Sequence, residues 1–104
     1  NDSVETIAIK KALGNHAYDI PVTSTKSMTG HLIGASGGIE VIATALMMER
    51  GKVHPTINLE TPGDGCDLNY VPGAPASREI RMALKNSFAF GGMNASLLLS
   101  RFEK

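Results

Sequence analysis

Apolar residues recur at helical spacing in two segments of the chain. The first begins at Asp2, which precedes Glu5 as an N-cap residue precedes its reciprocating acid, and it ends at Gly14. The second, residues 39–50, is apolar on nearly every face, which predicts a helix buried on most sides. Glu40 is the polar residue of this helix that requires an explanation, because burying a carboxylate without a partner is unfavourable.

Three other segments have the patterns of strands. Residues 22–25 form a short β-prone stretch between turn signals, which fits a buried strand. Residues 80–85 alternate between apolar and other residues, with Ile80, Met82 and Leu84 on the expected covered face. Residues 95–102 contain three consecutive leucines and are expected to be covered on both faces. 

The connections between these segments are marked by glycine and proline. Residues 86–94 contain two consecutive glycines and predict a hairpin connection between the last two strands. Residues 53–77 carry four prolines and a glycine-rich turn, which predicts a long ordered loop with little regular structure.

Composition and charge narrow the class of protein. The chain has 104 residues, 42% of them hydrophobic, and no apolar run approaches the roughly 20 residues of a membrane span, so we expect one soluble globular piece. Ten basic and ten acidic residues are interspersed, which argues against nucleic acid as a partner. The single cysteine, Cys66, favours a reducing compartment. The chain begins at Asn1 without an initiator methionine or signal peptide, which suggests a fragment.

Two generic kinds of site find little support in the sequence. The glycine-rich residues 30–38 match neither the dinucleotide-binding pattern nor the phosphate-loop pattern. The histidines His16, His31 and His54 are far apart and lack a neighbouring cysteine pair, so we expect no metal site.

The informative group is Lys26, His31 and Glu40. His31 precedes an apolar helix, where free N–H groups and the helix dipole favour a neutral imidazole that can donate a hydrogen bond to a developing oxyanion. Lys26 lies on the same loop and pairs with Glu40 if the loop folds back. The spacing alone favours a simpler alternative, in which Lys26 and Glu40 are solvated surface charges and His31 is a cap.

Four spaced motifs resemble those of the β-ketoacyl-acyl carrier protein synthases (3-oxoacyl-acyl carrier protein synthases). Residues 24–40 begin with Ser-Thr-Lys-Ser-Met-Thr-Gly-His, residues 55–59 read Pro-Thr-Ile-Asn-Leu, residues 65–72 begin with Gly-Cys-Asp-Leu, and residues 86–92 read Asn-Ser-Phe-Ala-Phe-Gly-Gly. They occur in the family's order and cover essentially the whole chain. The first and third motifs are most similar to synthase II, the elongating enzyme of dissociated fatty acid synthesis.

The resemblance implies an α/β chain, the C-terminal part of a thiolase-like fold with layered α-β-α architecture. Residues 1–104 would be its C-terminal segment, incomplete as an isolated chain. We therefore expect the segment alone to expose apolar surface, or to pack against another copy or the missing N-terminal part. The family's nucleophilic cysteine and first catalytic histidine lie upstream of Asn1. Cys66, in a proline-rich loop, is not expected to be the nucleophile.

The resemblance also assigns roles to the three candidate residues. His31 matches the second catalytic histidine, which polarises the malonyl thioester carbonyl as carbon dioxide leaves. Lys26 matches the lysine that organises the site electrostatically, and Glu40 matches the acid paired with it.

The glycine-bearing connection matches a gate in the family. Phe90 corresponds to an aromatic gate beside the nucleophile, and Gly91 and Gly92 would supply flexible backbone. Core packing is the alternative for Phe90 and our expectation for Phe88.

Two residues of this connection depart from the family pattern Phe-Gly-Phe-Gly-Gly-Thr-Asn. Ala89 replaces a glycine and narrows the backbone freedom next to the gate, and Met93 replaces a hydroxyl with a flexible apolar chain. The family's acyl chain-length preference is therefore not carried over to this chain.

The resemblance implies an acyltransferase that elongates fatty acyl chains by decarboxylative Claisen condensation with malonyl-acyl carrier protein. The segment alone would be inactive because it lacks the nucleophile. No cofactor is implied, since acyl and malonyl groups are carried on the phosphopantetheine of acyl carrier protein. The whole enzyme would be a homodimer, cytoplasmic in bacteria or in an organellar stroma or matrix.

Three alternatives remain open. A polyketide ketosynthase shares these motifs, although the close end at Lys104 argues for a shorter chain. A chain-length-factor subunit is non-catalytic, and intact Lys26 and His31 count against it. The third alternative is an independent interaction module.

Overall fold

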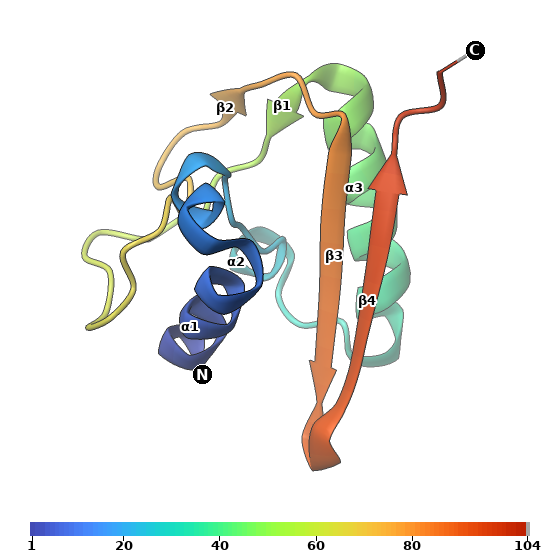
Figure 1. Cartoon of the computed structure of the whole chain (residues 1–104). Coiled ribbons are helices and arrows are strands. Elements are labelled where there is room, and N and C mark those ends of the chain that lie inside the picture. The colour runs from blue at the N-terminus through green and yellow to red at the C-terminus, as the bar shows by residue number, and fades with distance from the viewer. Residues whose placement is uncertain (104) are drawn as a thin grey trace.

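Two helices and a long β-hairpin make up most of the regular secondary structure (Figure 1). The computed structural model describes residues 1–103, and Lys104, the last residue of the predicted segment, lies outside that range. The helices are α1 (Asp2–Leu13), α2 (Lys26–Thr29) and α3 (Ser36–Arg50), with 3₁₀ turns at Gly14–Asp19, Ile33–Ala35 and Phe90–Gly92. The strands are β1 (Lys52–Val53), β2 (Ala76–Ser77), β3 (Met82–Ala89) and β4 (Met93–Ser100).

Helix α1 confirms the first predicted helix but not its predicted cap. Asp2, which was predicted to be the N-cap, is the first helical residue. The N-cap is Asn1, and its side chain makes no capping hydrogen bond. Asp2 and Glu5 lie in the first turn, where negative charge interacts favourably with the helix dipole. The helix ends at Leu13 because Gly14 adopts φ 60°, a conformation that glycine tolerates best.

Helix α3 begins three residues earlier than predicted, at Ser36, and ends where Gly51 takes the left-handed conformation at φ 62°. The prediction that it is buried on most sides is wrong for this chain. Ile39, Ile42 and Leu46 are 42%, 58% and 40% exposed. No second layer of residues 1–103 covers this side of the helix, so its apolar residues face outward.

Strands β3 and β4 form the predicted hairpin with a shorter connection than expected. They pair antiparallel from Met82 opposite Ser100 to Ala89 opposite Met93. The predicted connection, residues 86–94, therefore belongs mostly to the strands. A tight glycine turn at residues 90–92 allows the ladder to continue this far.

The predicted strand at residues 22–25 is absent. Val22 donates its N–H to the Asn69 carbonyl at 2.8 Å beside a single parallel bridge, and Thr25 already has helical angles as the N-cap of α2. The segment beside residues 22–25 is a loop, so it offers no strand with which they could pair. A single bridge forms and no strand results. That loop confirms the prediction for residues 53–77, with regular structure only at its ends, in β1 and β2.

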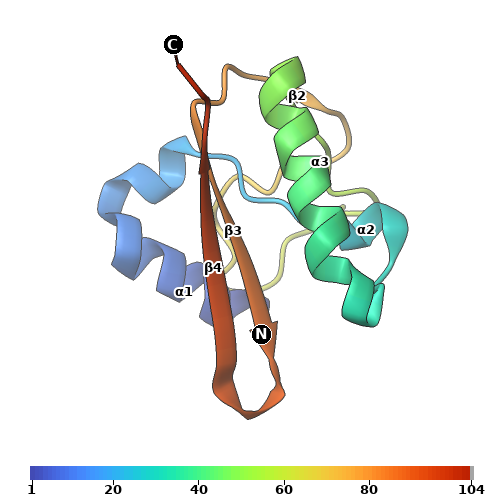
Figure 2. The same ribbon diagram turned by 90° about the vertical axis from the view of Figure 1, so that its right-hand side faces the viewer.

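Helix α3 lies against one face of the hairpin, as the turned view shows (Figure 2). The opposite face is open in the described chain, where Met82, Leu84 and Leu98 are 60%, 56% and 58% exposed. The face predicted to be covered is thus the exposed one. The hydrophobic core is small and consists of Ala17, Met48, Val53, Leu68 and Val71. The expected exposure of apolar surface is therefore observed.

Candidate functional site

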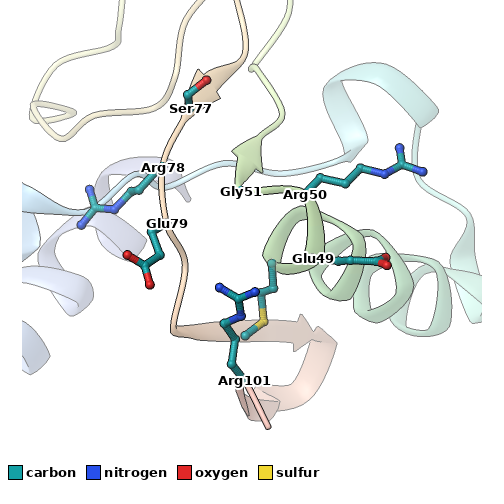
Figure 3. A pocket seen from close by; sticks show the side chains of 8 residues that line it. Glu49, Arg50, Gly51, Ser77, Arg78, Glu79 and Arg101 are labelled. Carbon is teal, nitrogen blue, oxygen red and sulfur yellow. The ribbon is translucent and has the colours of Figure 1, made fainter. Parts of the chain in front are cut away.

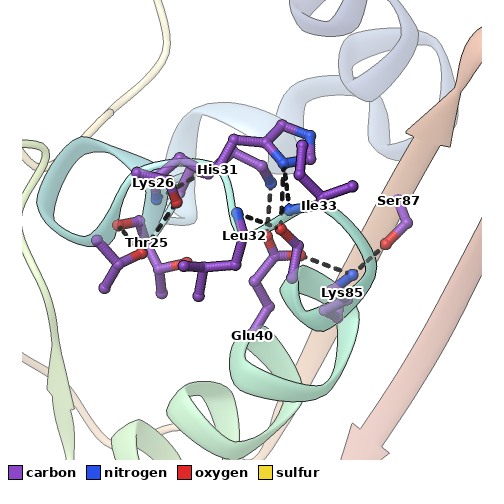
Figure 4. Close-up of polar contacts among 12 residues, drawn as sticks. Thr25, Lys26, His31, Leu32, Ile33, Glu40, Lys85 and Ser87 are labelled. Atoms are coloured by element: carbon purple, nitrogen blue, oxygen red, sulfur yellow. Dashed lines mark hydrogen bonds and ion pairs between the residues drawn. The ribbon is translucent and has the colours of Figure 1, made fainter.

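Two lysines and a glutamate converge where α2, α3 and β3 meet (Figure 4). Lys26 opens α2, Glu40 lies near the start of α3, and Lys85 lies within β3. The Nζ atom of Lys26 is 2.5 Å from Oε2 of Glu40, and Nζ of Lys85 is 2.8 Å from Oε1. We call these three residues the Lys–Glu–Lys cluster. One carboxylate thereby joins three elements that are distant in sequence.

The cluster is mostly shielded from solvent. The side chains of Glu40 and Lys85 are 12% and 10% exposed, whereas that of Lys26 is 40% exposed. The simpler alternative of two solvated charges therefore does not hold for Glu40. The structure brings Lys26 and Glu40 together because the loop after α2 folds back onto α3.

The electrostatics of the cluster favour an ionised Glu40. Partial burial raises the pKa of Glu40, but the hydrogen bonds from Lys26 and Lys85 outweigh burial and hold that pKa below its usual value. A second carboxylate, Glu5 of α1, lies in the field of Lys26. Burial and the neighbouring Asp2 raise the pKa of Glu5, and Lys26 partly offsets that rise.

The ring of His31 is held from one side by the turn that follows it (Figure 4). The backbone N–H of Ile33 donates to Nδ1 at 2.9 Å, and the hydroxyl of Ser36 lies 3.3 Å from the same nitrogen. Ser36 in turn accepts the N–H of Leu32 at 2.9 Å. Because Nδ1 accepts an N–H, the neutral ring carries its proton on Nε2, which is left to donate.

His31 is exposed and lies just before α3, close to its predicted position. The donor that orients it comes from the 3₁₀ turn at Ile33–Ala35 rather than from the first N–H groups of α3. Gly30, at φ 75°, ends α2 and lets the chain turn toward this loop.

The structure places Phe90 at the turn of the hairpin, apart from the Lys–Glu–Lys cluster. Its side chain is 102% exposed and Phe88 is 52% exposed, so the core-packing reading is wrong for both residues in this chain. Gly91 and Gly92 have φ 81° and 76°, values that side-chain-bearing residues rarely adopt.

The two departures from the family pattern cause no backbone strain. Ala89 is extended at φ −132°, a conformation open to any residue, so a glycine is not required there. Met93 begins β4 and is 72% exposed.

Sequence reasoning missed Lys85 and Ser36. The alternation of residues 80–85 places Lys85 on the face that was expected to be solvated, but this is the face against α3. No local signal identifies its partner, because Glu40 lies far away in the sequence. Ser36 had a weak signal, as a hydroxyl residue at the start of an apolar helix.

An open pocket of about 520 Å³ lies at the other end of α3 (Figure 3). It contains none of the predicted site residues. Arg101 and Glu79 reach into it, whereas Arg50 and Arg78 point away. Arg78 donates to the Asp19 carbonyl at 2.7 Å and is thereby engaged elsewhere. The candidate site therefore consists of the Lys–Glu–Lys cluster and His31, and this pocket is not part of it.

Residues 1–103 contain neither a cluster of metal ligands nor a membrane-spanning helix. No three histidine, cysteine, aspartate or glutamate side chains among them converge to hold a metal ion. None of the helices in the same range is both long enough and apolar enough to cross a membrane.

The sequence of this chain matches known protein families and relatives. Residues 1–60 match the family "Beta-ketoacyl synthase, C-terminal domain", and this range includes Lys26, His31 and Glu40. The chain is 57% identical to 3-oxoacyl-(acyl-carrier-protein) synthase 2 of Synechocystis sp. over 103 residues, which cover 99% of this chain and 25% of that relative. It therefore spans about a quarter of the curated relative.

Solved structures give the same result. One, of a type II polyketide acyl carrier protein in complex with its ketosynthase bound to the hexaketide, matches with a TM-score of 0.90 at 44% identity, covering 94% of this chain and 24% of that one. The ishigamide ketosynthase/chain length factor matches with a TM-score of 0.92 at 35% identity, covering 99% of this chain and 25% of that one.

Proposed function

The chain belongs to the β-ketoacyl synthase family, and from this premise we propose that it supplies part of the active site of a synthase that elongates fatty acyl chains. The reaction would be decarboxylative Claisen condensation with malonyl-acyl carrier protein. The fold agrees with the predicted class, since the chain superposes on ketosynthases as an α/β part of the thiolase-like fold. The 57% identity to a synthase 2 over nearly the whole chain supports fatty acid elongation as the main function.

The observation that carries the proposal is the orientation of His31. An N–H donor at Nδ1 leaves a neutral imidazole with its proton on Nε2. When the bond between the carboxylate and the α-carbon of a malonyl group breaks, carbon dioxide leaves and the electron pair moves toward the thioester oxygen. A preset neutral donor stabilises this developing enolate oxygen without having to lose its proton.

The enolate then completes the condensation. Its α-carbon attacks the carbonyl of an acyl group held on the family's upstream cysteine, a carbon–carbon bond forms, and the cysteine thiolate leaves. His31 takes part in the decarboxylation half of this sequence. Acyl transfer onto the cysteine precedes it and does not need the malonyl carbonyl.

The Lys26–Glu40 pair supports the same site electrostatically. Glu40 neutralises part of the positive charge of Lys26 and fixes its direction at the start of α2. A positive side chain on the loop of His31 favours the build-up of negative charge nearby. Lys26 is the more exposed partner, which is consistent with a group that faces a substrate channel in the whole enzyme.

Phe90 is proposed to act as the gate of this site. Its full exposure at a turn with two left-handed glycines gives it no packing that would hold it in one position within this chain. In the assembled enzyme such a side chain can move with the turn and admit malonyl groups after acylation.

The remaining properties of the whole enzyme are proposed from its relatives. One similar ketosynthase was solved in complex with an acyl carrier protein, which supports a carrier protein as the partner of this one. Phosphopantetheine on that carrier would hold the substrates, so no resident cofactor is proposed. We further propose a homodimer, located in the bacterial cytoplasm or in an organellar stroma or matrix.

A polyketide ketosynthase is the second candidate function. The superposition on a polyketide ketosynthase with a TM-score of 0.90 favours it over an unrelated activity. The two candidates differ in product: an elongating synthase hands each keto product on for reduction, whereas a polyketide synthase extends it again. Product length after repeated turnover without a reductase distinguishes them.

The test is the substitution His31→Ala in the full-length enzyme that contains this segment. We expect condensation with malonyl-acyl carrier protein to fall by at least about a hundredfold, as when an oxyanion donor is removed. Self-acylation from acyl-acyl carrier protein should remain within about twofold. His16→Ala is the matched control, because His16 is an exposed histidine outside the site. Undiminished elongation by the His31→Ala enzyme would contradict the proposal.

A further inference from the structure

We propose that Lys85 is a positioning residue of the active site, which holds Glu40 in the orientation that serves Lys26 and joins the strand leading to Phe90 to the loop of His31. This inference rests on the proposed function, because it assigns Lys85 a part in the same reaction. Neither the matched motifs nor the family resemblance assigns this residue a role.

The two oxygens of Glu40 have different partners. Oε1 contacts Lys85 at 2.8 Å and Oε2 contacts Lys26 at 2.5 Å. A carboxylate held by one lysine alone can rotate about its last torsion and exchange its oxygens. A second cation on the other oxygen removes this freedom and fixes the direction from which Lys26 is bound.

Lys85 is largely buried. Its side chain is 10% exposed, less than that of Lys26 at 40%. A buried ammonium is unfavourable unless it is paired and hydrogen-bonded. Lys85 meets both conditions, since it binds Glu40 and the hydroxyl of Ser87, two residues along the same face of β3.

Lys85 lies on the strand that leads to the turn of the hairpin. It pairs with Leu97 across the hairpin, and the same strand continues through Ala89 to the turn that carries Phe90. From Lys85 the ionic contacts run through Glu40 to Lys26, at the start of the loop that carries His31 (Figure 4). The contacts therefore tie the gate-bearing hairpin to the side of the site that binds the malonyl group.

The experiment compares the full-length enzyme with Lys85→Met, Lys85→Arg and Ser87→Ala. We expect Lys85→Met to lower kcat for condensation about tenfold, with KM for malonyl-acyl carrier protein and the rate of self-acylation within about twofold. Lys85→Arg, which keeps the charge, should recover at least half of the lost rate. Lys52→Met is the matched control, because Lys52 is an exposed strand lysine with no ion pair among residues 1–103.

A double substitution tests the route of the effect. If Lys85 acts through Glu40, Lys85→Met should have no further effect on kcat in a Glu40→Gln background. Ser87→Ala keeps the charge but removes one contact of Lys85, so a loss of about two- to threefold is expected. This milder change also tests the proposal if Lys85→Met does not fold.

The outcomes separate this proposal from the proposed function. An enzyme that condenses normally with Lys85→Met, or that loses both half-reactions equally together with its thermal stability, would overturn the role of Lys85 alone. A wild-type enzyme that is acylated but never condenses malonyl groups would overturn the proposed function, whatever Lys85 does. Retained self-acylation, a lower kcat and rescue by arginine would support the positioning role.

Discussion

The Lys–Glu–Lys cluster and the turn of the hairpin both carry residues that the sequence marks as functional, but only the cluster has its contacts within this chain. Glu40 is bound at both oxygens and mostly buried, whereas Phe90 is fully exposed. The cluster is built from three elements of the chain itself. The turn has no packing from residues 1–103.

The difference follows from the physical demands of the two kinds of side chain. A buried carboxylate without a cation is strongly destabilising, so its partners must be in place whenever the chain folds. An exposed phenylalanine only lacks the favourable free energy of burial, and a folded chain tolerates this lack. The Lys–Glu–Lys cluster is therefore preformed in this chain, whereas the proposed gate Phe90 has no packing among residues 1–103.

The largest effect is expected for the substitution Glu40→Leu in the full-length enzyme, which removes the carboxylate of the cluster. It leaves Lys85 buried without its carboxylate, and we expect a loss of about 3 kcal/mol of stability. Urea unfolding followed by fluorescence or circular dichroism measures it. Glu60→Leu, at an exposed loop position, is the control and should change stability little. A loss below about 0.5 kcal/mol for Glu40→Leu would mean that the cluster is not preformed.

A smaller effect is expected from pH. The pKa of Glu40 is lower in the folded chain than in the unfolded chain, so its contribution to stability is present at neutral pH. This contribution is lost as the pH falls through the folded pKa, below the usual glutamate value of about 4.3. Melting temperatures of the wild type and of Glu40→Gln should therefore converge on acidification.

The pH dependence assigned to Glu40 must be distinguished from that of the other carboxylates. Other carboxylates titrate in the same range, and Asp67 also has a lowered pKa, through its hydrogen bond to Lys10. Asp67→Asn is therefore the reference variant. A gap between wild type and Glu40→Gln that stays constant from neutral to acidic pH would show that the Glu40 carboxylate is not stabilised by its lysines.

The smallest change in stability is expected at the turn. Phe90→Ala should alter stability by less than about 0.5 kcal/mol if the side chain stays as exposed in the whole enzyme as it is here. Differential scanning calorimetry of the full-length protein measures this. Phe88→Ala, at a half-exposed position near the end of β3 just before the turn, is the matched second variant. A large loss for Phe90→Ala would show that the rest of the enzyme packs this side chain into a core.

Much of the local structure could be predicted from the sequence. Gly14 and Gly51 mark the ends of the two long helices, and the glycines at the turn mark the hairpin. These features depend on backbone conformations that few residues adopt, so they can be read from single positions. The predicted strand at residues 22–25 was wrong because a β-prone stretch becomes a strand only where a neighbouring strand is present.

The candidate site was predicted only in part. Lys26, His31 and Glu40 were identified from their motif, but Lys85 was assigned to the solvated face of its strand. A period of two shows that the faces of a strand differ, and it does not show which face another element will cover. In this chain α3 covers the face that carries Lys85, and Lys85 meets Glu40 there.

Local signals in the sequence were sufficient to predict the ends of the helices, the hairpin, the proline-rich loop and the motif that holds Lys26 and His31. The two lysine contacts of Glu40, and the N–H of Ile33 that His31 accepts, are seen only in the folded chain. The reason is that glycine, proline and motif signals act over a few neighbouring residues. Ion pairs across elements depend on how distant segments meet in space, and the direction of the His31 ring depends on the backbone path of the turn that follows it.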